Sequence, residues 1–308
     1  MKTDLELDHF YFSDDSYLKE DLKNVNLKGL TGGKLLRSKL VQYMGEIFSL
    51  GEAEVVKLGR VVELVHNATL THDDVIDNSH MRRDNPSIPA LINNKKSVLL
   101  GDYMLARALH ELSDFNNPKL TAELTLTLKD LVEGEWIQFE NTNPYQITTT
   151  LYETLALKKT GSLFRWCFIA PYLASTPDHK LYDDLVKLGE EIGIIFQMTD
   201  DIIDFNSESK KTYGLDFRNN NLNYVLHFVG LNHPELTKKF LQLESMDELT
   251  ETEKTYFDAA IKLAKDRMQK KVQLCRDIIA RLSQSADGDT SSLSEIESLI
   301  DLLQTRLY

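Results

Sequence analysis

Two acidic motifs with the same spacing are the residues of this sequence best suited to chemistry. Residues 73–77 and 200–204 both read Asp-Asp-x-x-Asp within a helix-like stretch. On a helix, residues i and i+4 share a face, so the first and last aspartates of each motif point the same way. Carboxylate oxygens are ligands that Mg²⁺ prefers, and two such faces opposed across a cavity would clamp a diphosphate. The candidate metal ligands are Asp73, Asp74, Asp77, Asp200, Asp201 and Asp204.

A single acidic motif on a helix is most often a solvated face, and this alternative applies here too. Largely apolar segments precede both motifs, however, at residues 68–70 and 194–196. Clustered like charges on partly buried helix turns cost stability unless a cation offsets them. Two copies in this setting favour a metal site over a solvated surface.

The composition excludes several classes of protein. A net charge of −13 argues against nucleic-acid binding, which needs a basic surface. The sequence has no long apolar run and no apolar leader after Met1, so we expect neither a transmembrane helix nor a signal peptide. Cys167 and Cys275 lie in no metal-binding or redox motif. We therefore expect a cytoplasmic protein whose two reduced cysteines serve in packing.

Apolar residues recur with helical spacing through most of the chain. Alternating strand patterns bounded by Asn-Gly or Asp-Gly turns are missing, and the polar breaks are short, the longest covering residues 206–223. The pattern predicts a nearly all-α fold with long core helices, in a single domain over residues 1–308. The clearest helical stretches are residues 55–65, 98–112, 120–137, 151–173, 181–196 and 256–282.

Basic residues lie close to the acidic motifs or at an expected helix start. Lys34 and Arg37 follow a glycine pair and would share one face of the helix that begins there. A helix N-terminus with nearby cations binds anions, although surface pairs of this kind are common. Arg82 and Arg83 follow the first motif. They could compensate its charge or donate bidentate hydrogen bonds to phosphate.

Three further positions share helices with these groups. His66 lies about two turns before the first motif, where packing is the commoner role of a histidine. Lys159 and Thr160 precede Gly161 within a helical pattern, and a glycine there allows close packing or a local break. Gln197 lies one turn before the second motif.

Taken in order, these pieces resemble the trans-isoprenyl diphosphate synthases, also called polyprenyl synthetases. The matching segments begin at Gly32-Gly33-Lys34-x-x-Arg37 and end at Lys211-x-x-Gly214. Between them, in the family's order, lie His66, the first acidic motif, Arg82-Arg83, Gly101-Asp102-Tyr103, Gly134-Glu135-x-x-Gln138, Lys159-Thr160 and Phe196-Gln197 with the second acidic motif. The resemblance implies the all-α isoprenoid synthase fold, a large bundle of mostly antiparallel helices around a deep central cavity.

The resemblance also implies a role for each candidate residue. Three Mg²⁺ ions would be bound through the substrate diphosphate, with Asp73, Asp77 and Asp200 as ligands and the other three motif aspartates in support. The implied contacts to the allylic diphosphate are Arg82, Lys159, Thr160, Gln197 and Lys211. The implied isopentenyl diphosphate site consists of Lys34, Arg37, His66 and Arg83.

The implied reaction is prenyl transfer. Mg²⁺ and basic side chains would stabilise the diphosphate as its C–O bond ionises, and isopentenyl diphosphate would attack the allylic cation in a dry cavity. The residues implied to carry the catalysis are Asp73, Asp77, Asp200, Lys159 and Arg82, with the released diphosphate as the base. Family members are usually homodimers, and residues 98–112 are apolar on more than one side.

Ala68 and Thr69 bear on product length. In the family, bulky aromatics just before the first acidic motif stop short-chain synthases at about farnesyl length, and these two residues are small. The resemblance therefore implies an all-trans product of about octaprenyl length, grown from farnesyl or geranylgeranyl diphosphate and used for quinone side chains. A short-chain synthase is the alternative. Such an apolar product passes poorly from the protein into water, so its release calls for a transient contact with lipid or a partner.

The sequence departs most from the family at residues 219–223. A Gly-Lys-Pro-Thr-like segment is usual there, and the lysine expected near Asn221 is missing. This departure keeps open a heteromeric synthase subunit with little activity alone. A terpene cyclase is another alternative, but its second metal motif typically mixes Asn, Ser and Glu, and it lacks the Lys34/Arg37 site. A purely structural helical protein would not need the ordered set of motifs.

Overall fold

The computed structural model describes residues 17–22, 35–82, 85–175, 180–205, 214–219, 221–285 and 291–305. Its residue contacts group into two compact units. Unit 1 comprises Met1–Glu123 and Ala170–Thr176, and unit 2 comprises Leu124–Ile169 and Pro177–Tyr308. The boundaries fall inside two helices, α8 (Pro118–Glu140) and α10 (Ser162–Ser175).

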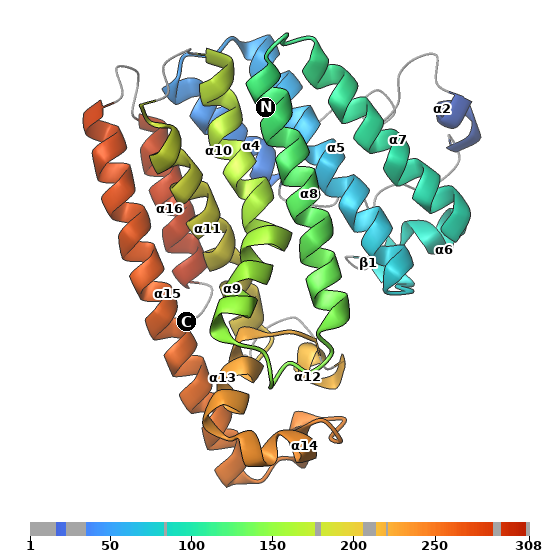
Figure 1. The fold of residues 1–308 in the computed structure, drawn as a ribbon, viewed down its shortest axis with the longest axis vertical. Coiled ribbons are helices and arrows are strands. Elements are labelled where there is room, and N and C mark those ends of the chain that lie inside the picture. The colour runs from blue at the N-terminus through green and yellow to red at the C-terminus, as the bar shows by residue number, and fades with distance from the viewer. Residues whose placement is uncertain are drawn as a thin grey trace. The chain divides into compact units, whose positions relative to one another are not determined.

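Unit 1 is built around α5 (Glu52–Ile76), which carries the first acidic motif at its end. The helix α7 (Asn94–Ser113) lies beside α5, and α4 (Leu36–Ile47) packs against it as well (Figure 1). The apolar stripe of α5 is fully buried, so burial of this face rather than local propensity fixes the long helix. The unit also contains α2 (Tyr17–Leu22), α6 (Ile88–Ile92) and the antiparallel strands β1 (Met81–Arg82) and β2 (Asn85–Pro86).

Unit 2 is built around α11 (Tyr182–Ile203), which carries the second acidic motif at its end. Its apolar stripe is fully buried, and α15 (Glu251–Ser285) lies beside it (Figure 1). The helix α13 (Tyr224–Asn232) also packs against α15. The unit's other elements are α9 (Thr149–Ala156), the π-helix η1 (Leu157–Gly161), α12 (Leu215–Asn219), η2 (Pro234–Leu236), α14 (Thr237–Phe240), η3 (Met246–Glu248) and α16 (Ser291–Thr305).

The all-α class expected from the sequence is confirmed, and five of the six long helical stretches are single helices. Two segments differ in detail. Residues 151–173, expected as one helical stretch, divide into α9, η1 and α10, with Gly161 at the break. Residues 206–223, expected as a polar loop, contain the short helix α12. In the described part of the chain, no helix has the length and apolar character needed to cross a membrane.

Candidate active site

The first acidic motif ends α5 in unit 1, and its three aspartates differ in exposure. Asp73 is half-buried, Asp77 is the exposed residue that follows the helix, and Asp74 is buried. Nε and one terminal nitrogen of Arg82 both donate to the same oxygen of Asp74, with Nε at 2.9 Å. Asp74 is therefore held by the protein, whereas Asp73 and Asp77 are the more accessible carboxylates.

Arg82 compensates the buried charge of Asp74 in this structure. The sequence left two roles open for this arginine, charge compensation and phosphate binding, and the ion pair shows the first. A guanidinium carries five N–H donors, of which this pair engages two. The contact of Arg82 with an allylic diphosphate stays a prediction.

Arg37 and His66, two residues of the expected isopentenyl diphosphate site, lie together in unit 1. Nη1 of Arg37 on α4 donates to Nε2 of His66 on α5 at 3.2 Å. Because a guanidinium has only donors, Nε2 accepts and the imidazole is neutral in this geometry. Lys34 and Arg83, expected at the same site, lie outside the described residues.

The residues expected to set product length lie about one turn before the first motif on α5. Ala68 is fully buried, and Thr69 is half-buried with its hydroxyl donating to the His66 carbonyl at 2.9 Å. Val65 on the preceding turn and Met104 on α7 are fully buried as well. Ala68 thus belongs to the core of unit 1, where a larger side chain must displace its neighbours.

The second acidic motif ends α11 in unit 2, and its middle aspartate is also buried. Asp201 is 2% exposed. One of its oxygens accepts hydrogen bonds from the Tyr152 hydroxyl and, at 2.8 Å, from the Tyr224 N–H. The other accepts from Nε2 of Gln197 at 2.8 Å. Asp201 therefore holds the site together, and the half-buried Asp200 is the more accessible carboxylate.

Asp204 and Asn223 tie the segment after α11 to this motif. The Asp216 N–H donates to Oδ2 of Asp204 at 3.0 Å. The Asn223 amide donates to Oδ2 of Asp216 at 2.7 Å and to the Asp201 carbonyl at 3.1 Å, and its oxygen caps α13 by accepting from the Val225 N–H at 2.8 Å. One asparagine thus joins the acidic motif, α12 and the start of α13.

The surroundings of Asp201 change its acidity. Burial raises the pKa of its carboxyl to about 8, and the neighbouring Asp216 carboxylate adds to the shift. The hydrogen-bond donors to Asp201 oppose this rise. Burial, reinforced by Asp201, also raises the pKa of Tyr152 well above its ordinary value, so the phenol keeps the proton that it donates.

Lys159, Gln197 and Asp201 converge on one cavity of about 150 Å³ in unit 2. Nζ of Lys159 donates to Oε2 of Glu135 at 2.6 Å and to Oε1 of Gln138 at 2.8 Å, both on α8. A lysine ammonium has three N–H donors, and these contacts engage two. The cavity thus presents an anchored cation and carboxylate oxygen on its walls, a combination suited to a metal-bound diphosphate.

A chain of hydrogen bonds fixes the Gln197 amide in this cavity. The Thr160 hydroxyl donates to Oε1 of Gln197 at 2.9 Å, while Nε2 donates to Asp201. These two hydrogen bonds fix the orientation of the Gln197 amide, with its carbonyl oxygen toward η1 and its N–H group toward the acidic motif.

The sequence reasoning missed Tyr152 and Asn223. Tyr152 precedes Lys159 by two helical turns, so a shared helix face was the signal that could have found it. Asn223 lies in the segment that departs from the family pattern, which concealed its role. Lys211, expected to contact the allylic diphosphate, lies outside the described residues.

The accessible carboxylates of each acidic motif have the chemistry of partial magnesium ligands, which a substrate would complete. Among the described residues, no three His, Cys, Asp or Glu side chains form a ready-made site for a metal ion. Mg²⁺ usually retains waters and binds through one or two carboxylates together with substrate phosphates. Asp73 and Asp77 in unit 1, and Asp200 in unit 2, are carboxylates of the kind that such a site uses.

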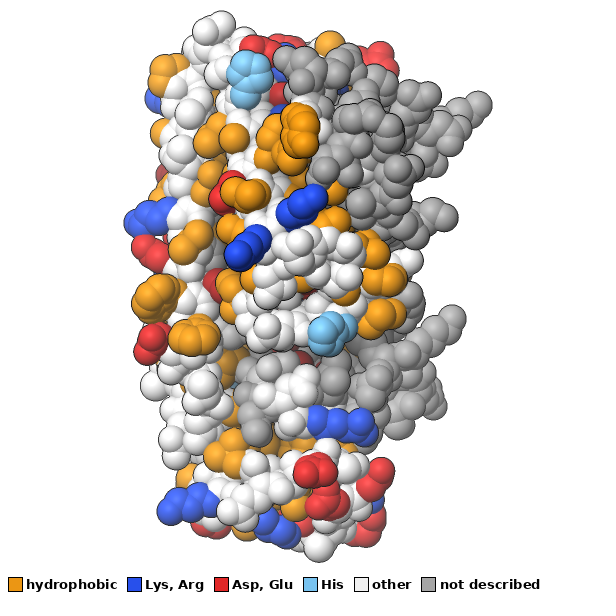
Figure 2. Space-filling view, turned by 90° about the vertical axis from the view of Figure 1, so that its right-hand side faces the viewer, with side chains coloured by type: hydrophobic (Ala, Val, Ile, Leu, Met, Phe, Trp, Pro, Cys, Tyr) orange, Lys and Arg blue, Asp and Glu red, His pale blue; other side chains and the backbone are white. Residues whose placement is uncertain are grey.

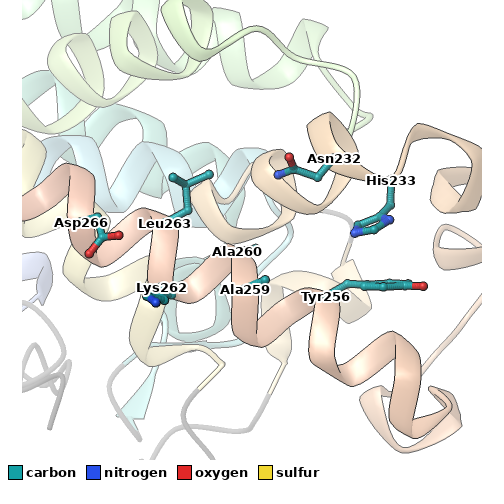
Figure 3. Close-up of a pocket in the computed structure, with 8 residues that line it drawn as sticks. All are labelled: Asn232, His233, Tyr256, Ala259, Ala260, Lys262, Leu263 and Asp266. Carbon is teal, nitrogen blue, oxygen red and sulfur yellow. The ribbon is translucent and has the colours of Figure 1, made fainter.

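A second depression, of about 530 Å³, lies in unit 2 between the end of α13 and the first half of α15 (Figure 3). His233 and Tyr256 stack at one end of it, with ring centroids 3.7 Å apart, and Lys262 and Asp266 line another part. No residue of the expected active site lines this groove.

Comparison with known sequences finds a family match and several curated relatives. The family model for polyprenyl synthetase matches residues 19–262. A decaprenyl-diphosphate synthase from Dictyostelium discoideum is 34% identical over 58% of this chain. The matched part spans only 39% of that relative's length. A prenyl transferase from Synechocystis sp. is 28% identical over 90% of this chain and 87% of that protein.

Solved structures share the fold. A decaprenyl diphosphate synthase from Rhodobacter capsulatus superposes with a TM-score of 0.83 at 25% identity, covering 98% of this chain and 94% of that chain. An octaprenyl pyrophosphate synthase from Helicobacter pylori gives 0.75 at 22% identity, covering 93% and 94%. A polyprenyl synthase from Caulobacter crescentus, complexed with calcium and isoprenyl diphosphate, gives 0.80 at 23% identity, covering 98% and 92%. The chain belongs to the polyprenyl synthetase family, a family of prenyltransferase enzymes.

Proposed function

We propose that this chain condenses isopentenyl diphosphate onto an allylic diphosphate with the help of Mg²⁺. The observation that carries the proposal is the cavity of unit 2, where Lys159, Gln197 and Asp201 meet. A cation, an oriented amide and an adjoining carboxylate motif are what ionisation of a metal-bound diphosphate requires. The Arg37–His66 pair in unit 1 supports a second phosphate site.

In this proposal the carboxylates and basic side chains named below hold the diphosphate while its bond to carbon breaks. Asp73, Asp77 and Asp200 are the proposed ligands of three Mg²⁺ ions, which supply charge neutralisation of the leaving group when bound. Lys159 and Arg82 add positive charge. Apolar surroundings of the allylic chain would keep water from the cation.

We further propose a product of about octaprenyl length, grown from farnesyl or geranylgeranyl diphosphate and used in quinone side chains. Relatives named as hexaprenyl, nonaprenyl and decaprenyl synthases support this range, as do the small residues Ala68 and Thr69. We place the enzyme in the cytoplasm, with residues 1–308 as one polyprenyl synthetase domain and lipid or a partner assisting release. A short-chain synthase and a heteromeric subunit are the alternatives, and a fission yeast relative is named as subunit 1 of its synthase.

The direct test is incubation of the purified chain with Mg²⁺, farnesyl diphosphate and radiolabelled isopentenyl diphosphate. We expect radioactive products of hexaprenyl to decaprenyl length, and none when EDTA removes the metal. Products that stop at geranylgeranyl length would support the short-chain alternative. Absence of any elongation by the chain alone would refute the proposal of an independent enzyme.

Asn221 lines the cavity where the family usually supplies a lysine, and its amide donates to Oδ1 of Asp216 at 3.2 Å. We predict that Asn221→Lys lowers the KM for the allylic diphosphate about fivefold, because a charge-assisted contact replaces a neutral amide. Asn219→Lys is the matched control, since it adds the same charge on α12 outside the cavity lining. An equal effect of both variants would show general charge attraction instead of a local contact.

We also propose a homodimer. Val98 and Leu99 on α7 are exposed, as are Trp136 and Phe139 on α8, with Trp136 at 68%. Figure 2 shows that one face of the molecule carries apolar side chains among charged ones. Exposed aromatic side chains of this size are typical of protein interfaces.

A charge at Trp136 should break this dimer. We predict that Trp136→Glu shifts the sedimentation coefficient from that of a dimer to that of a monomer, because a desolvated carboxylate is costly in an interface. Leu302→Glu on α16 changes a comparably exposed apolar residue and should leave the dimer intact. A wild-type protein that sediments as a monomer would contradict the proposal.

A further inference from the structure

Two consecutive lysines of the π-helix η1 reach different parts of α8. Lys158 donates to Oδ1 of Asp130 at 2.8 Å and to Oε2 of Glu133 at 2.6 Å. Lys159, the proposed diphosphate contact, reaches Glu135 and Gln138 further along the same helix. Two consecutive side chains of η1 therefore anchor it to α8, Lys158 at residues 130 and 133 and Lys159 at residues 135 and 138.

The backbone of η1 also lies unusually close to its neighbours. A Cβ atom added to Gly134 of α8 would lie 2.7 Å from the backbone nitrogen of Lys159. One added to Gly193 of α11 would lie 2.4 Å from the Cα atom of Gly161. The main chain of η1 is therefore confined on two sides, and its lysine side chains add further contacts with α8.

The anchor of Lys158 belongs to a largely buried ionic cluster. Asp130 and Arg165 are each 6% exposed, and the Arg165 guanidinium donates to the second oxygen of Asp130 at 3.2 Å. It also lies 3.6 Å from Glu190. The hydrogen bonds that Lys158 donates to Asp130 and Glu133 raise the pKa of its ammonium, so the ammonium stays charged.

Buried ion pairs contribute little net stability, because desolvation offsets their attraction. Their better-supported role is to specify one geometry among several similar ones. Through Lys158 the cluster connects to the turn from which Lys159 lines the cavity, where geometry matters most.

We infer that Lys158, anchored by Asp130, is a positioning residue that fixes η1 so that Lys159 and Thr160 address the allylic diphosphate. Lys158 itself does not line the cavity. The inference rests on the proposed function and deepens it. It assigns Lys158 a positioning role at the allylic diphosphate site and no role at the isopentenyl diphosphate site.

The test is Lys158→Met, which keeps an unbranched apolar stem and removes the charge. Asp130 retains its Arg165 partner, so the variant leaves no buried carboxylate without a cation. We expect the KM for farnesyl diphosphate to rise at least about tenfold, since small misplacements of a binding group have effects of this size. The KM for isopentenyl diphosphate should stay within about twofold, because Lys158 bonds to α8, whereas Arg37 and His66, proposed to bind that substrate, lie on α4 and α5.

Lys129→Met is the matched control. Lys129 is an exposed lysine on the same helix, 3.7 Å from the same Glu133, so the variant removes an equal charge without touching η1. Lys158→Arg should restore much of the farnesyl diphosphate affinity. If Lys158→Met does not fold, Glu133→Gln removes only the more exposed half of the anchor and should raise the same KM about threefold.

A second readout is calorimetric titration of inorganic diphosphate in the presence of Mg²⁺, which should show weaker binding by Lys158→Met. A folded variant with an unchanged farnesyl diphosphate KM would overturn the inference. Equal increases in both KM values would also overturn it, because they indicate a general structural defect. A wild-type chain that neither elongates a primer nor binds diphosphate would instead refute the proposed function, and this inference would fall with it.

Discussion

Asp200→Asn should lower the rate of prenyl transfer roughly a thousandfold, the usual scale for loss of a preorganised electrostatic contact in the transition state. The amide keeps the shape of the carboxylate and removes the charge that would bind Mg²⁺. Asp200 is only half-buried, so the unfolding temperature should stay within about 2 °C of the wild-type value. Magnesium titration of the residual activity should show a higher half-saturating concentration.

Comparison with a variant of the neighbouring Asp201 distinguishes the loss of a metal ligand from structural damage. Asp201 accepts three hydrogen bonds from protein donors, so Asp201→Asn should lower the unfolding temperature as well as the activity. Asp184→Asn on the same helix is the control for loss of charge. It breaks an exposed ion pair with Arg281 and should change neither property much. Retention of full activity by Asp200→Asn would exclude this residue as a metal ligand.

Helical periodicity predicted most of the fold because each long helix buries one continuous apolar stripe. In α11 the same stripe continues into the second acidic motif, so the sequence also predicted where the motif lies on its helix. It could not distinguish the aspartates within a motif. That difference comes from Arg82 for Asp74, and from Tyr152, 49 residues away, for Asp201.

The π-helix shows a second limit of sequence reasoning. Its extra residue per turn leaves almost no mark on a periodic pattern, and only Gly161 indicated a local break. Close approach to α8 and α11 determines the conformation, and those helices lie at distant positions in the sequence. The anchor of Lys158 was hidden for the same reason, because nothing local distinguishes it from any other lysine next to Lys159.

The second large effect concerns product length. We predict that Ala68→Phe shortens the main product to farnesyl or geranylgeranyl length while condensation continues. Ala68 is fully buried beside the helix face that carries Thr69, about one turn before the first acidic motif. A phenyl ring there must displace core neighbours and would occupy space that a growing chain needs. Chromatography of dephosphorylated products against prenyl alcohol standards measures the change.

Overpacking alone costs about 1–3 kcal/mol of stability, so a shorter product must be separated from a weakened protein. Ala264→Phe provides the comparison, because Ala264 is also fully buried but lies on α15 in unit 2, whereas Ala68 and the first acidic motif belong to unit 1. It should lower the unfolding temperature by a similar amount and leave product length unchanged. Equal shortening in both variants would trace the effect to loosened packing. Unchanged length in Ala68→Phe would show that the chain grows past this position without touching it, and that its end is set deeper along α5, where Val65 and Met104 are the next candidates.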